Sequence, residues 1–477
     1  MPSSQLPPPS LPLFPALQAY LDSLGLFRMT PGLDRIIAVL ENLDLKRPPF
    51  VTAQVAGTNG KGSTSSMLAA LAQSHGLRVG LHTSPHFLSV RERIRINGRM
   101  LPEAQWLELG NRLLASGGET LSYFEFATVL AVMAFAREGV HLAVMETGLG
   151  GSFDATTALE ADLVLLTPFG LDHQAVLGPT LADIAKDKAG AIRRGKPVYS
   201  APQAKEARQE IIRAADERHA PLHWVEALQD SLAAPLAMRL TGEHQKTNAA
   251  LALAGWRHLA ASYGRKWRWA DSPSHERKQA SQGRTLQNQA DQGPAARGLS
   301  PQTPPVFVES FQKLSGPEAL GLASAWLPGR LHSIAPRASL PAVLLDGAHN
   351  KHAFEALFRS LKTRNIVPGA MIFACLGDKD PLELLPFLRG MAPGPVYVPP
   401  IPGNPRAMEP GALASLIGAQ AVPARSMSEA VEKAVAHMRR ETPESFTEGA
   451  DKRPLLICGS LYLLGQFFAL YPENLEG

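Results

Sequence analysis

The sequence predicts an α/β protein in which a large, mostly parallel sheet with helices on both faces is followed by a smaller α/β domain. From residue 50 onward, short runs of aliphatic and β-branched residues alternate with helical runs, as in parallel strands joined by helices. Several strand-like runs are apolar throughout, which is expected when helices cover both faces of a sheet. The length of 477 residues is enough for two or three domains of roughly 150 residues each.

The first sheet is predicted from strand-like runs at residues 50–56, 77–82, 142–145 and 162–167. A helix is expected over residues 63–74, directly after the first strand. Residues 124–136 form the most apolar stretch, but it includes Glu125 and is shorter than the roughly 20 apolar residues that a membrane span requires. We interpret this stretch as a buried helix and expect no membrane contact.

A smaller, Rossmann-like α/β domain is predicted from later strand-like runs at residues 342–345, 370–376, 396–398 and 455–458. Glycine and proline are frequent at 329–341, where we place the hinge. The chain thus divides into a flexible, proline-rich lead-in (1–16), a central domain (17–333) and a C-terminal domain (334–477). Residues 271–305 are polar and charged, so they have little apolar surface to bury and are predicted to be a disordered insertion.

The overall charge and the cysteine content argue against several classes of function. Lys and Arg number 47 against 43 Asp and Glu, and a net charge of +4 over this length gives no basis for nucleic-acid binding. Two cysteines, Cys375 and Cys458, cannot form a disulfide scaffold or a four-cysteine zinc site. The N-terminus has no pattern of a secretion signal, and we expect a cytoplasmic protein.

The strongest motif lies between the first predicted strand and its helix. It combines glycines, a lysine and hydroxyl side chains in the order Gly57, Thr58, Asn59, Gly60, Lys61, Gly62 and Ser63. Small residues let backbone N–H groups close around phosphate oxygens, and the helix N-terminus and Lys61 add positive charge. A plain glycine-rich turn is the alternative, because the spacing differs from the generic phosphate-binding loop. The lysine and the hydroxyls favour phosphate binding and a first domain of the P-loop type.

Polar side chains also follow the other strands of the first predicted sheet. Ser84 follows the run at 77–82, Glu146 ends the next, and His173 lies beyond the run at 162–167. Because ligands bind at the carboxyl ends of parallel strands, these side chains are expected to converge beside the glycine-rich loop. Together they suit Mg²⁺, which prefers oxygen and accepts an occasional imidazole. Taken singly, a capping role for Glu146 and an ordinary loop position for His173 are the alternatives.

The second half of the chain has one comparable motif. Asp346 and His349 follow the run at 342–345, where an aspartate can bind a ribose or a lysine and a histidine can approach a phosphate, although Asp-Gly also marks plain turns. Arg330, just before the hinge, is either a surface arginine or a residue that reaches a phosphate when the domains close. Lys188, at the end of a helical run, is by itself a solvated surface charge.

These motifs, in this order and spacing, resemble those of the folylpolyglutamate synthase and dihydrofolate synthase family, within the Mur ligase superfamily. The stretches that carry the resemblance are residues 55–63, 83–86, 145–151, 170–173, 188–190 and 346–350. The match runs from about residue 17 to about residue 465, with the 271–305 insertion as the main interruption.

The resemblance implies an ATP-dependent ligase that adds L-glutamate to dihydropteroate or reduced folates, with ATP and Mg²⁺ as cofactors. The family transfers the γ-phosphate of ATP to a carboxylate, and the glutamate amine then attacks the acyl phosphate. Positional matching makes Lys61, Lys188 and His173 the catalytic residues, with Lys61 on the β- and γ-phosphates and Lys188 at a position that CO₂ carbamylates. Ser84, Glu146 and His173 match the Mg²⁺ ligands.

The match also implies contacts to both ends of the substrates. The nucleotide contacts are the loop at 57–63 together with Asn248, Arg330, Asp346 and His349, and Ser460 is a weaker match. The pteroate end is expected near residues 20–35 and at Ser122, Tyr123, Phe124, Glu125, Phe153, Asp154 and Ala155, where an aromatic ring can stack on a flat pterin. The family's usual Gly-Gly-Arg-x-Asp-Ala-Thr-Asn departs here, because Ser152 and Thr157 replace the arginine and the last asparagine.

We therefore expect a bifunctional folate ligase that acts as a monomer on small-molecule substrates. A peptidoglycan-precursor ligase with the same chemistry is the near alternative, although residues 91–96 resemble the folate branch. A non-catalytic nucleotide-binding module is the second alternative, for which Ser152 and Thr157 are the only indication.

Overall fold

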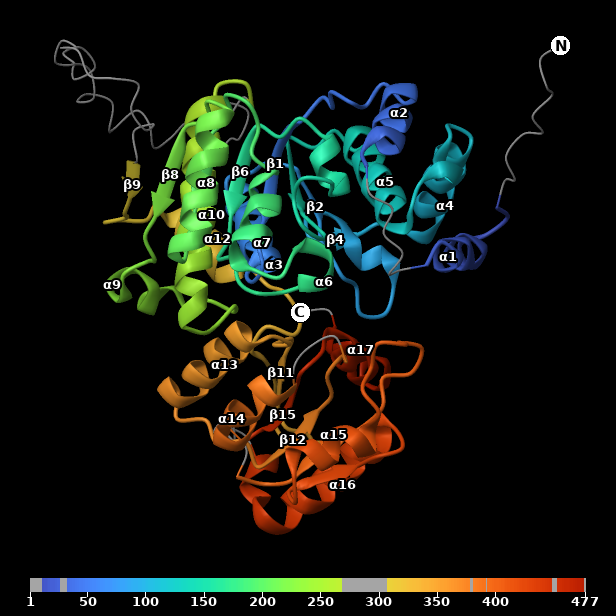
Figure 1. Ribbon diagram of the computed structural model, residues 1–477, viewed down its shortest axis with the longest axis vertical. Coiled ribbons are helices and arrows are strands. Elements are labelled where there is room, and N and C mark those ends of the chain that lie inside the picture. The colour runs from blue at the N-terminus through green and yellow to red at the C-terminus, as the bar shows by residue number, and fades with distance from the viewer. Residues whose placement is uncertain are drawn as a thin grey trace.

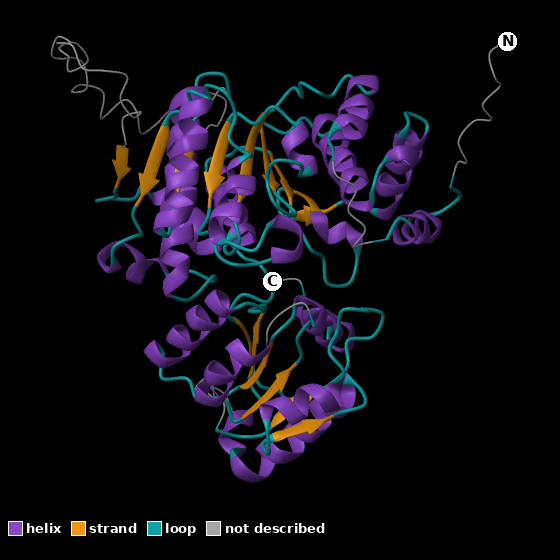
Figure 2. Ribbon diagram, viewed as in Figure 1, coloured by secondary structure: helices purple, strands orange, loops and turns teal. Residues whose placement is uncertain are grey.

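The computed structural model describes residues 11–25, 32–267, 307–377, 381–391, 393–447 and 453–475. Within them the chain forms two lobes, each built on one sheet with helices on both faces (Figures 1 and 2). The first lobe contains a nine-stranded sheet and the second a six-stranded sheet, which confirms the predicted α/β class. No helix of the described ranges is long and apolar enough to cross a membrane. The insertion predicted at 271–305 lies outside the described residues.

The first sheet has the strand order β4-β3-β2-β5-β1-β6-β7-β8-β9. The strands are β1 (Val51–Ala56), β2 (Val79–His82), β3 (Ile94–Ile96), β4 (Arg99–Met100), β5 (Leu142–Glu146), β6 (Leu163–Leu166), β7 (Val198–Ser200), β8 (Leu222–Val225) and β9 (Phe307–Glu309). β1 pairs in parallel with β5 and β6, whereas the edge strands β3 and β4 pair antiparallel. β1 is therefore central, so the loop after it lies in the middle of the carboxyl edge.

Helices cover both faces of this sheet. They are α1 (Phe14–Ser23), α2 (Asp34–Asn42), α3 (Lys61–Ser74), α4 (Glu103–Leu114), α5 (Tyr123–Arg137), α6 (Gln174–Leu177), α7 (Leu181–Ala189), α8 (Lys205–Glu217), α9 (Asp230–Ala233), α10 (Glu243–Tyr263) and α12 (Gly316–Ser324). α3, α10 and α12 pack over Ala53 and Val55 of β1. On the other face, α7 and α8 pack over Val164 and Leu166 of β6. α1, α2, α4 and α5 form a separate core around Trp106.

The second sheet has the order β10-β11-β15-β12-β13-β14. Its strands are β10 (His332–Ile334), β11 (Val343–Asp346), β12 (Ala370–Phe373), β13 (Val396–Val398), β14 (Ala421–Pro423) and β15 (Leu455–Cys458), and its helices are α13 (Lys351–Thr363), α14 (Pro381–Met391), α15 (Pro410–Ile417), α16 (Met427–Glu441) and α17 (Leu461–Leu470). Along β11, Val343 and Leu345 face the core under α16 and α17, and Leu344 faces the core under α13 to α15. Both faces are thus buried, as the apolar run predicts.

Three element boundaries differ from expectation. α1 begins at Phe14, inside the expected lead-in, because Pro15 suits the first turn of a helix. α3 begins at Lys61 rather than at residue 63, because Gly60 supplies a left-handed N-cap residue with φ 91°. β10 begins at His332 and pairs with β11, so the second sheet starts two residues before the expected division at 334.

Candidate active site

The loops that leave β1, β5 and β6 lie side by side at the edge of the first sheet that faces the second lobe (Figure 1). The register sets Val55 beside Glu146 and Ala56 beside Leu166, so these loops begin at the same level. Asn350, which follows β11 of the second lobe, bonds to side chains of two of these loops. Polar residues at the exits of β1, β6 and β11 are therefore brought together from both lobes.

The loop between β1 and α3 packs so closely that two of its positions admit only glycine. Gly57 has φ 151°, and an added Cβ would overlap Thr167 Oγ1. Gly60 has φ 91°, and an added Cβ would overlap the side-chain amide of Asn248 on α10. These contacts place Asn248 against the loop and leave the first turn of α3 at the sheet edge, where a helix N-terminus attracts anions.

Two lysines converge on the same carbonyl of this loop. Lys61 Nζ donates to Gly57 O at 3.2 Å and to Thr58 O at 3.1 Å, and Lys188 Nζ donates to Gly57 O at 3.0 Å. Lys188 is only 3% exposed. Burial and the neighbouring charge of Lys61 lower the pKa of Lys188 to about 7, although Asp172 opposes the shift. The end of α7 thus delivers an amine of which about half is neutral near pH 7.

Glu146, at the end of β5, is a buried carboxylate without an ion-pair partner among the described residues. It is 4% exposed, and its Oε2 accepts the Ser84 N–H at 2.9 Å. Burial raises the pKa of Glu146, and the positive charges of Lys61 and Arg330 oppose that rise. An uncompensated buried charge is costly, and a carboxylate next to a serine suits a hard cation that keeps several waters. The residues at this position therefore fit a divalent metal ion.

His173 follows β6 and contacts the preceding aspartate. Its backbone N–H donates to Asp172 Oδ1 at 2.8 Å, and its Nε2 lies 3.8 Å from the same oxygen. The described residues contain no group of three or more His, Cys, Asp or Glu side chains that could hold a metal ion. The predicted set of Ser84, Glu146 and His173 has only two side chains of these types, so that finding does not test it.

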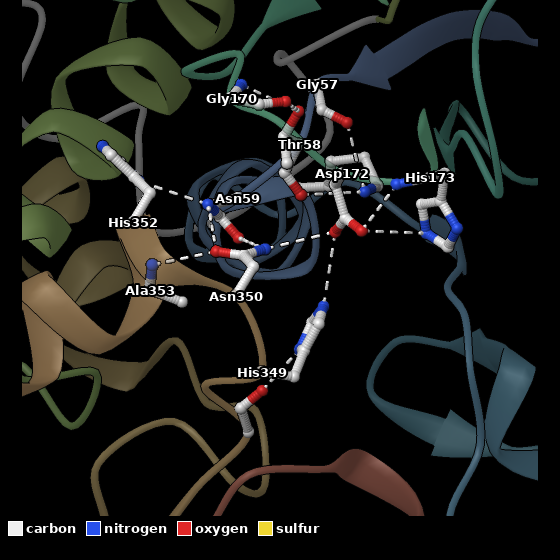
Figure 3. A network of polar contacts seen from close by, with 12 residues as sticks. Gly57, Thr58, Asn59, Gly170, Asp172, His173, His349, Asn350, His352 and Ala353 are labelled. Atoms are coloured by element: carbon white, nitrogen blue, oxygen red, sulfur yellow. Dashed lines mark hydrogen bonds and ion pairs between the residues drawn. The ribbon is translucent and has the colours of Figure 1, made fainter. Parts of the chain in front are cut away.

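Asp172 is also the point where the second lobe reaches the first (Figure 3). Asn350 Nδ2 donates to Asp172 Oδ2 at 3.1 Å, and His349 Nε2 lies 3.5 Å from that oxygen. Asn350 also exchanges hydrogen bonds with Asn59 of the glycine-rich loop, at 3.2 and 3.3 Å. His352 Nδ1 lies 3.2 Å from Asn59 Nδ2.

The remaining predicted nucleotide residues bond to groups of their own surroundings. Both oxygens of Asp346 accept backbone N–H groups at 2.9 Å, from Leu331 and from Ala348. Asp346 therefore shapes the turn that presents Arg330 and His349. Ser63 Oγ, in the first turn of α3, accepts from Gln245 Nε2 at 3.3 Å, and Ser460 caps α17.

Most of the residues predicted to hold the pteroate end have partners inside the first lobe. Ser122 and Glu125 form the capping box of α5, and Glu125 Oε1 accepts from Arg35 at 3.1 Å. Tyr123 is 2% exposed, and Phe124 packs so closely on Gly148 that an added Cβ would overlap its ring. Residues 26–31 of the expected N-terminal contact region lie outside the described residues.

In the loop after β5, one aromatic ring is exposed and the two residues after it are buried. Asp154 Oδ2 accepts the N–H groups of Gly148 and Leu149 at 2.9 Å, and Ala155 is buried. Phe153, by contrast, is 65% exposed. It is therefore the one residue of 153–155 that presents an aromatic face to a ligand.

The two departures from the family pattern are accommodated within this loop. Ser152 Oγ donates to Asp187 O at 3.0 Å, and Thr157 Oγ1 donates to Gly151 O at 2.6 Å. Arg193 Nη2 donates to Thr157 O at 2.8 Å, so a cation from beyond α7 reaches the position.

Sequence reasoning missed Arg93 as a site residue. Its Nε donates to His86 Nδ1 at 2.8 Å, and its guanidinium lies 5.3 Å from the centre of the Tyr123 ring. Burial lowers the pKa of Arg93, and the proximity of Tyr123, Tyr462 and Glu146 opposes that shift. No sequence pattern singles out Arg93, because it is one of three arginines at alternate positions, 91, 93 and 95, and only the fold buries it.

Comparison with known proteins identifies relatives over most of the chain. A family model described as "Dihydrofolate synthetase, C-terminal domain" matches residues 335–470. The dihydrofolate synthase/folylpolyglutamate synthase of Bacillus subtilis is 30% identical over 77% of this chain and 80% of its own length. The folylpolyglutamate synthase of Lacticaseibacillus casei is 28% identical over 93% of this chain and 95% of its own length.

A solved structure matches both lobes together. The bifunctional folylpolyglutamate synthase/dihydrofolate synthase of Yersinia pestis, complexed with AMPPNP and a manganese ion, has a TM-score of 0.74 and 26% identity. The match covers 98% of this chain and 100% of that one. The motifs, the two-lobe architecture and these relatives lead to one conclusion, which confirms the resemblance seen in the sequence: the chain belongs to the folylpolyglutamate synthase and dihydrofolate synthase family.

Proposed function

We propose that this protein is a bifunctional ligase that joins L-glutamate to dihydropteroate and then adds further glutamates to reduced folates. Members of the family are ATP-dependent glutamate ligases that use a divalent metal ion, and this chain is one of them. The observation that carries the residue assignments is the meeting of Lys61, Lys188 and Glu146 at one glycine-rich loop. Such uncompensated charges cost stability and are typical of functional sites.

The proposed reaction has two steps. An oxygen of the substrate carboxylate accepts the γ-phosphoryl group of ATP, which leaves ADP and an acyl phosphate. The glutamate amine then attacks the acyl carbon, expels phosphate and loses a proton. Both steps move negative charge, so the protein acts mainly by positioning the reactants and by supplying cations and hydrogen-bond donors.

Lys61 is proposed to bind the β- and γ-phosphates. Its present partners are two neutral carbonyls, and a phosphate oxygen forms a stronger, charge-assisted hydrogen bond with an ammonium group. The loop at 57–63 adds backbone N–H groups at the N-terminus of α3. Asn248, Arg330, Asp346 and His349 are proposed to complete the nucleotide site.

Ser84, Glu146 and His173 are proposed to hold the metal ion. When bound, a divalent cation neutralises charge on the phosphoryl group in transfer. Glu146 supplies a carboxylate whose charge is otherwise unbalanced, and the Ser84 N–H fixes the direction of that carboxylate.

Lys188 is proposed to be carbamylated. A neutral amine attacks CO₂, forms a carbamate and releases one proton, so the pKa of about 7 at Lys188 favours the reaction. The product replaces a buried amine, whose protonated form Lys61 repels, by an anion, which Lys61 attracts.

Arg93 is proposed to bind a carboxylate of the incoming glutamate. The two side chains that contact it, His86 and Tyr123, are neutral, because burial lowers the pKa of His86 to about 3 and raises that of Tyr123 to about 12. A buried guanidinium without a carboxylate partner among the described residues suits an anionic ligand. Tyr462, at the start of α17, acts on the same guanidinium, so both lobes border this position. The exposed ring of Phe153 is proposed to contact the pteroate end.

The test is mass spectrometry of products formed with ATP, Mg²⁺, L-glutamate and either dihydropteroate or tetrahydrofolate. We expect a mass increase of one glutamate on dihydropteroate and of one or more on tetrahydrofolate. Product from only one acceptor would reject bifunctionality. Product only from a nucleotide-linked muramyl acceptor would instead support the peptidoglycan alternative, and phosphate release that needs neither acceptor nor glutamate would support a module without ligase activity.

We also propose that residues 17–333 and 334–477 form the central and C-terminal domains, and that the protein is a cytoplasmic monomer. The family match at 335–470 supports a division near residue 334, and β10 of the second sheet begins two residues before it. Light scattering at working concentration tests the oligomeric state, and a mass of twice 51.2 kDa would overturn it.

A further inference from the structure

One buried amide joins the two lobes at the loop that is proposed to hold phosphate. We call Asn59, Asp172 and Asn350 the interlobe cluster (Figure 3). Asn350 is 6% exposed, and its Nδ2 donates to Asn59 Oδ1 at 3.2 Å and to Asp172 Oδ2 at 3.1 Å. Its Oδ1 accepts from Asn59 Nδ2 at 3.3 Å and from the Ala353 N–H at 2.9 Å. A single side chain therefore bonds the glycine-rich loop, the β6 exit and the first turn of α13.

The side chain of Asn59 depends on the second lobe for its contacts. Every side-chain partner that the structure describes for Asn59 lies in the second lobe, at Asn350 and His352. Asn59 stands between Gly57 and Gly60, which both have positive φ angles that glycine adopts readily. When the second lobe moves away, the loop loses these contacts while the rest of the first lobe keeps its own.

We propose that Asn350 is a positioning residue that makes the shape of the phosphate-binding loop, and the orientation of Asp172 and His173, depend on docking of the second lobe. The inference rests on the proposed function, because it assigns a role at that same site. Asn350 touches no reacting atom in this proposal. It acts through Asn59 on the loop that carries Lys61, and through Asp172 on the neighbouring backbone N–H of His173.

The consequence for the reaction is a coupling between closure and phosphoryl transfer. An open enzyme has a loop free to relax, so ATP is bound weakly and its γ-phosphate is not aligned. A closed enzyme has the loop held by a reciprocal pair of amide hydrogen bonds, and the same movement brings Arg330 and His349 to the nucleotide. ATP therefore transfers its γ-phosphoryl group only when both lobes surround the carboxylate that receives it.

The test uses substitutions that separate this role from helix capping. Asn350→Ser keeps an N-cap oxygen for the Ala353 N–H, because serine is a favoured N-cap residue, but is too short to reach Asn59 and Asp172. Asn350→Asp keeps the cap and the size, loses the Nδ2 donor and faces Asp172 with a like charge. Ser426→Ala is the matched control, since it removes the N-cap of α16 in the same lobe without touching the cluster.

The first measurement is hydrogen exchange of the full-length protein without any substrate. We expect backbone N–H groups of residues 57–62 to exchange at least about fivefold faster in Asn350→Ser, faster still in Asn350→Asp, and at the wild-type rate in Ser426→Ala. Unchanged exchange at 57–62 in both Asn350 variants would overturn the proposal.

The second measurement is steady-state ligation. We expect Asn350→Ser to raise the KM for ATP about tenfold and to lower kcat by a similar factor, with the KM for glutamate within twofold of wild type. Asn59→Ser should have a smaller effect in the same direction, because it keeps the bond between Asn350 and Asp172, and the double variant should be no worse than Asn350→Ser, which already lacks the contact to Asn59. Additive losses, or a loss confined to the melting temperature, would overturn the proposal.

The two proposals fail separately. A wild-type protein that forms no glutamylated product would reject the proposed function, whereas the exchange comparison would still decide whether Asn350 controls the loop.

Discussion

Two carboxylates of the first lobe, Glu125 on α5 and Glu146 on β5, are equally buried and differ in what surrounds them. Glu125 is 5% exposed, pairs with Arg35 and accepts the Ser122 N–H at 2.8 Å, so its charge is balanced within the fold. Glu146 is 4% exposed, and among the described residues it accepts a hydrogen bond only from the Ser84 N–H. Burial alone thus does not mark a functional carboxylate, whereas a buried charge without a partner does.

The same contrast separates the regions around them. The core of α1, α2, α4 and α5 packs against β5, and its buried carboxylate Glu125 is balanced by Arg35 and by the capping box of α5. The carboxyl edge of the first sheet instead gathers Lys61, Lys188, Glu146 and Arg93 with incomplete pairing. The paired charge of the first region contributes to stability. The incompletely paired charges of the second region cost stability and suit the binding of ligands.

The largest expected effect comes from removing Lys61, the proposed phosphate-binding cation at the carboxyl edge of the first sheet. Lys61→Ala should lower the rate of glutamate ligation by at least about 100-fold, because loss of one transition-state contact costs several kcal/mol. Its melting temperature should stay within a few degrees of wild type, since Lys61 bonds only loop carbonyls. Product formation at a near-normal rate would show that the glycine-rich loop does not bind phosphate.

A paired substitution tests the comparison directly. Glu146→Gln should abolish most ligation and raise the melting temperature at pH 7, because the raised pKa shows that the fold disfavours the ionised form that Gln replaces. Glu125→Gln should lower stability by about 1 kcal/mol through its weakened bond to Arg35 and should retain most activity. The opposite pattern would reverse our assignment of the two carboxylates, and thermal melts with ligation rates measure both.

A smaller effect is expected at Arg93. Arg93→Gln should raise the KM for glutamate about 10- to 100-fold, in keeping with about 1.5–3 kcal/mol for a hydrogen bond to a charged group. The KM for ATP should change by less than twofold. An equal rise in both constants would mean that Arg93 supports the whole edge rather than one carboxylate.

The pH dependence of Lys188 follows from its lowered pKa. The neutral amine, which reacts with CO₂, becomes the main form as pH rises through about 7, so carbamylation and ligation should both increase across that range. Removing CO₂ should lower activity several-fold and reversibly. Carbon-13 NMR with labelled CO₂ should show one carbamate signal that is absent in Lys188→Arg, and its presence in that variant would place the carbamate elsewhere.

The smallest effect is expected outside both regions. Deleting residues 271–305 should leave ligation and the melting temperature close to wild type, because the segment has few aliphatic residues to bury. The full-length chain is the control, and an insoluble product would show that the segment packs against the first lobe.

Particular residues show how far sequence reasoning reached. The strand runs at 396–398 and 455–458 match β13 and β15 to the residue, because continuous apolar runs leave little choice of element. The predicted start of α3, at residue 63, lies two residues after the observed one, because Gly60 in its left-handed conformation lets Lys61 be the first helical residue. Tyr123 and Glu125 were predicted at the pteroate end, and their roles remain predictions, but the structure gives both of them partners inside the lobe.

The sequence by itself determined the alternation of strands and helices and the residue types at the strand exits, because apolar periodicity and glycine spacing are local properties. Only the tertiary structure decided which charges have partners. Arg93, Glu146 and Lys188 are separated by up to 95 positions, from 93 to 188, and whether a buried charge is balanced depends on what other segments bring to it. The same holds for Asn350, whose amide acquires a role only where two lobes meet.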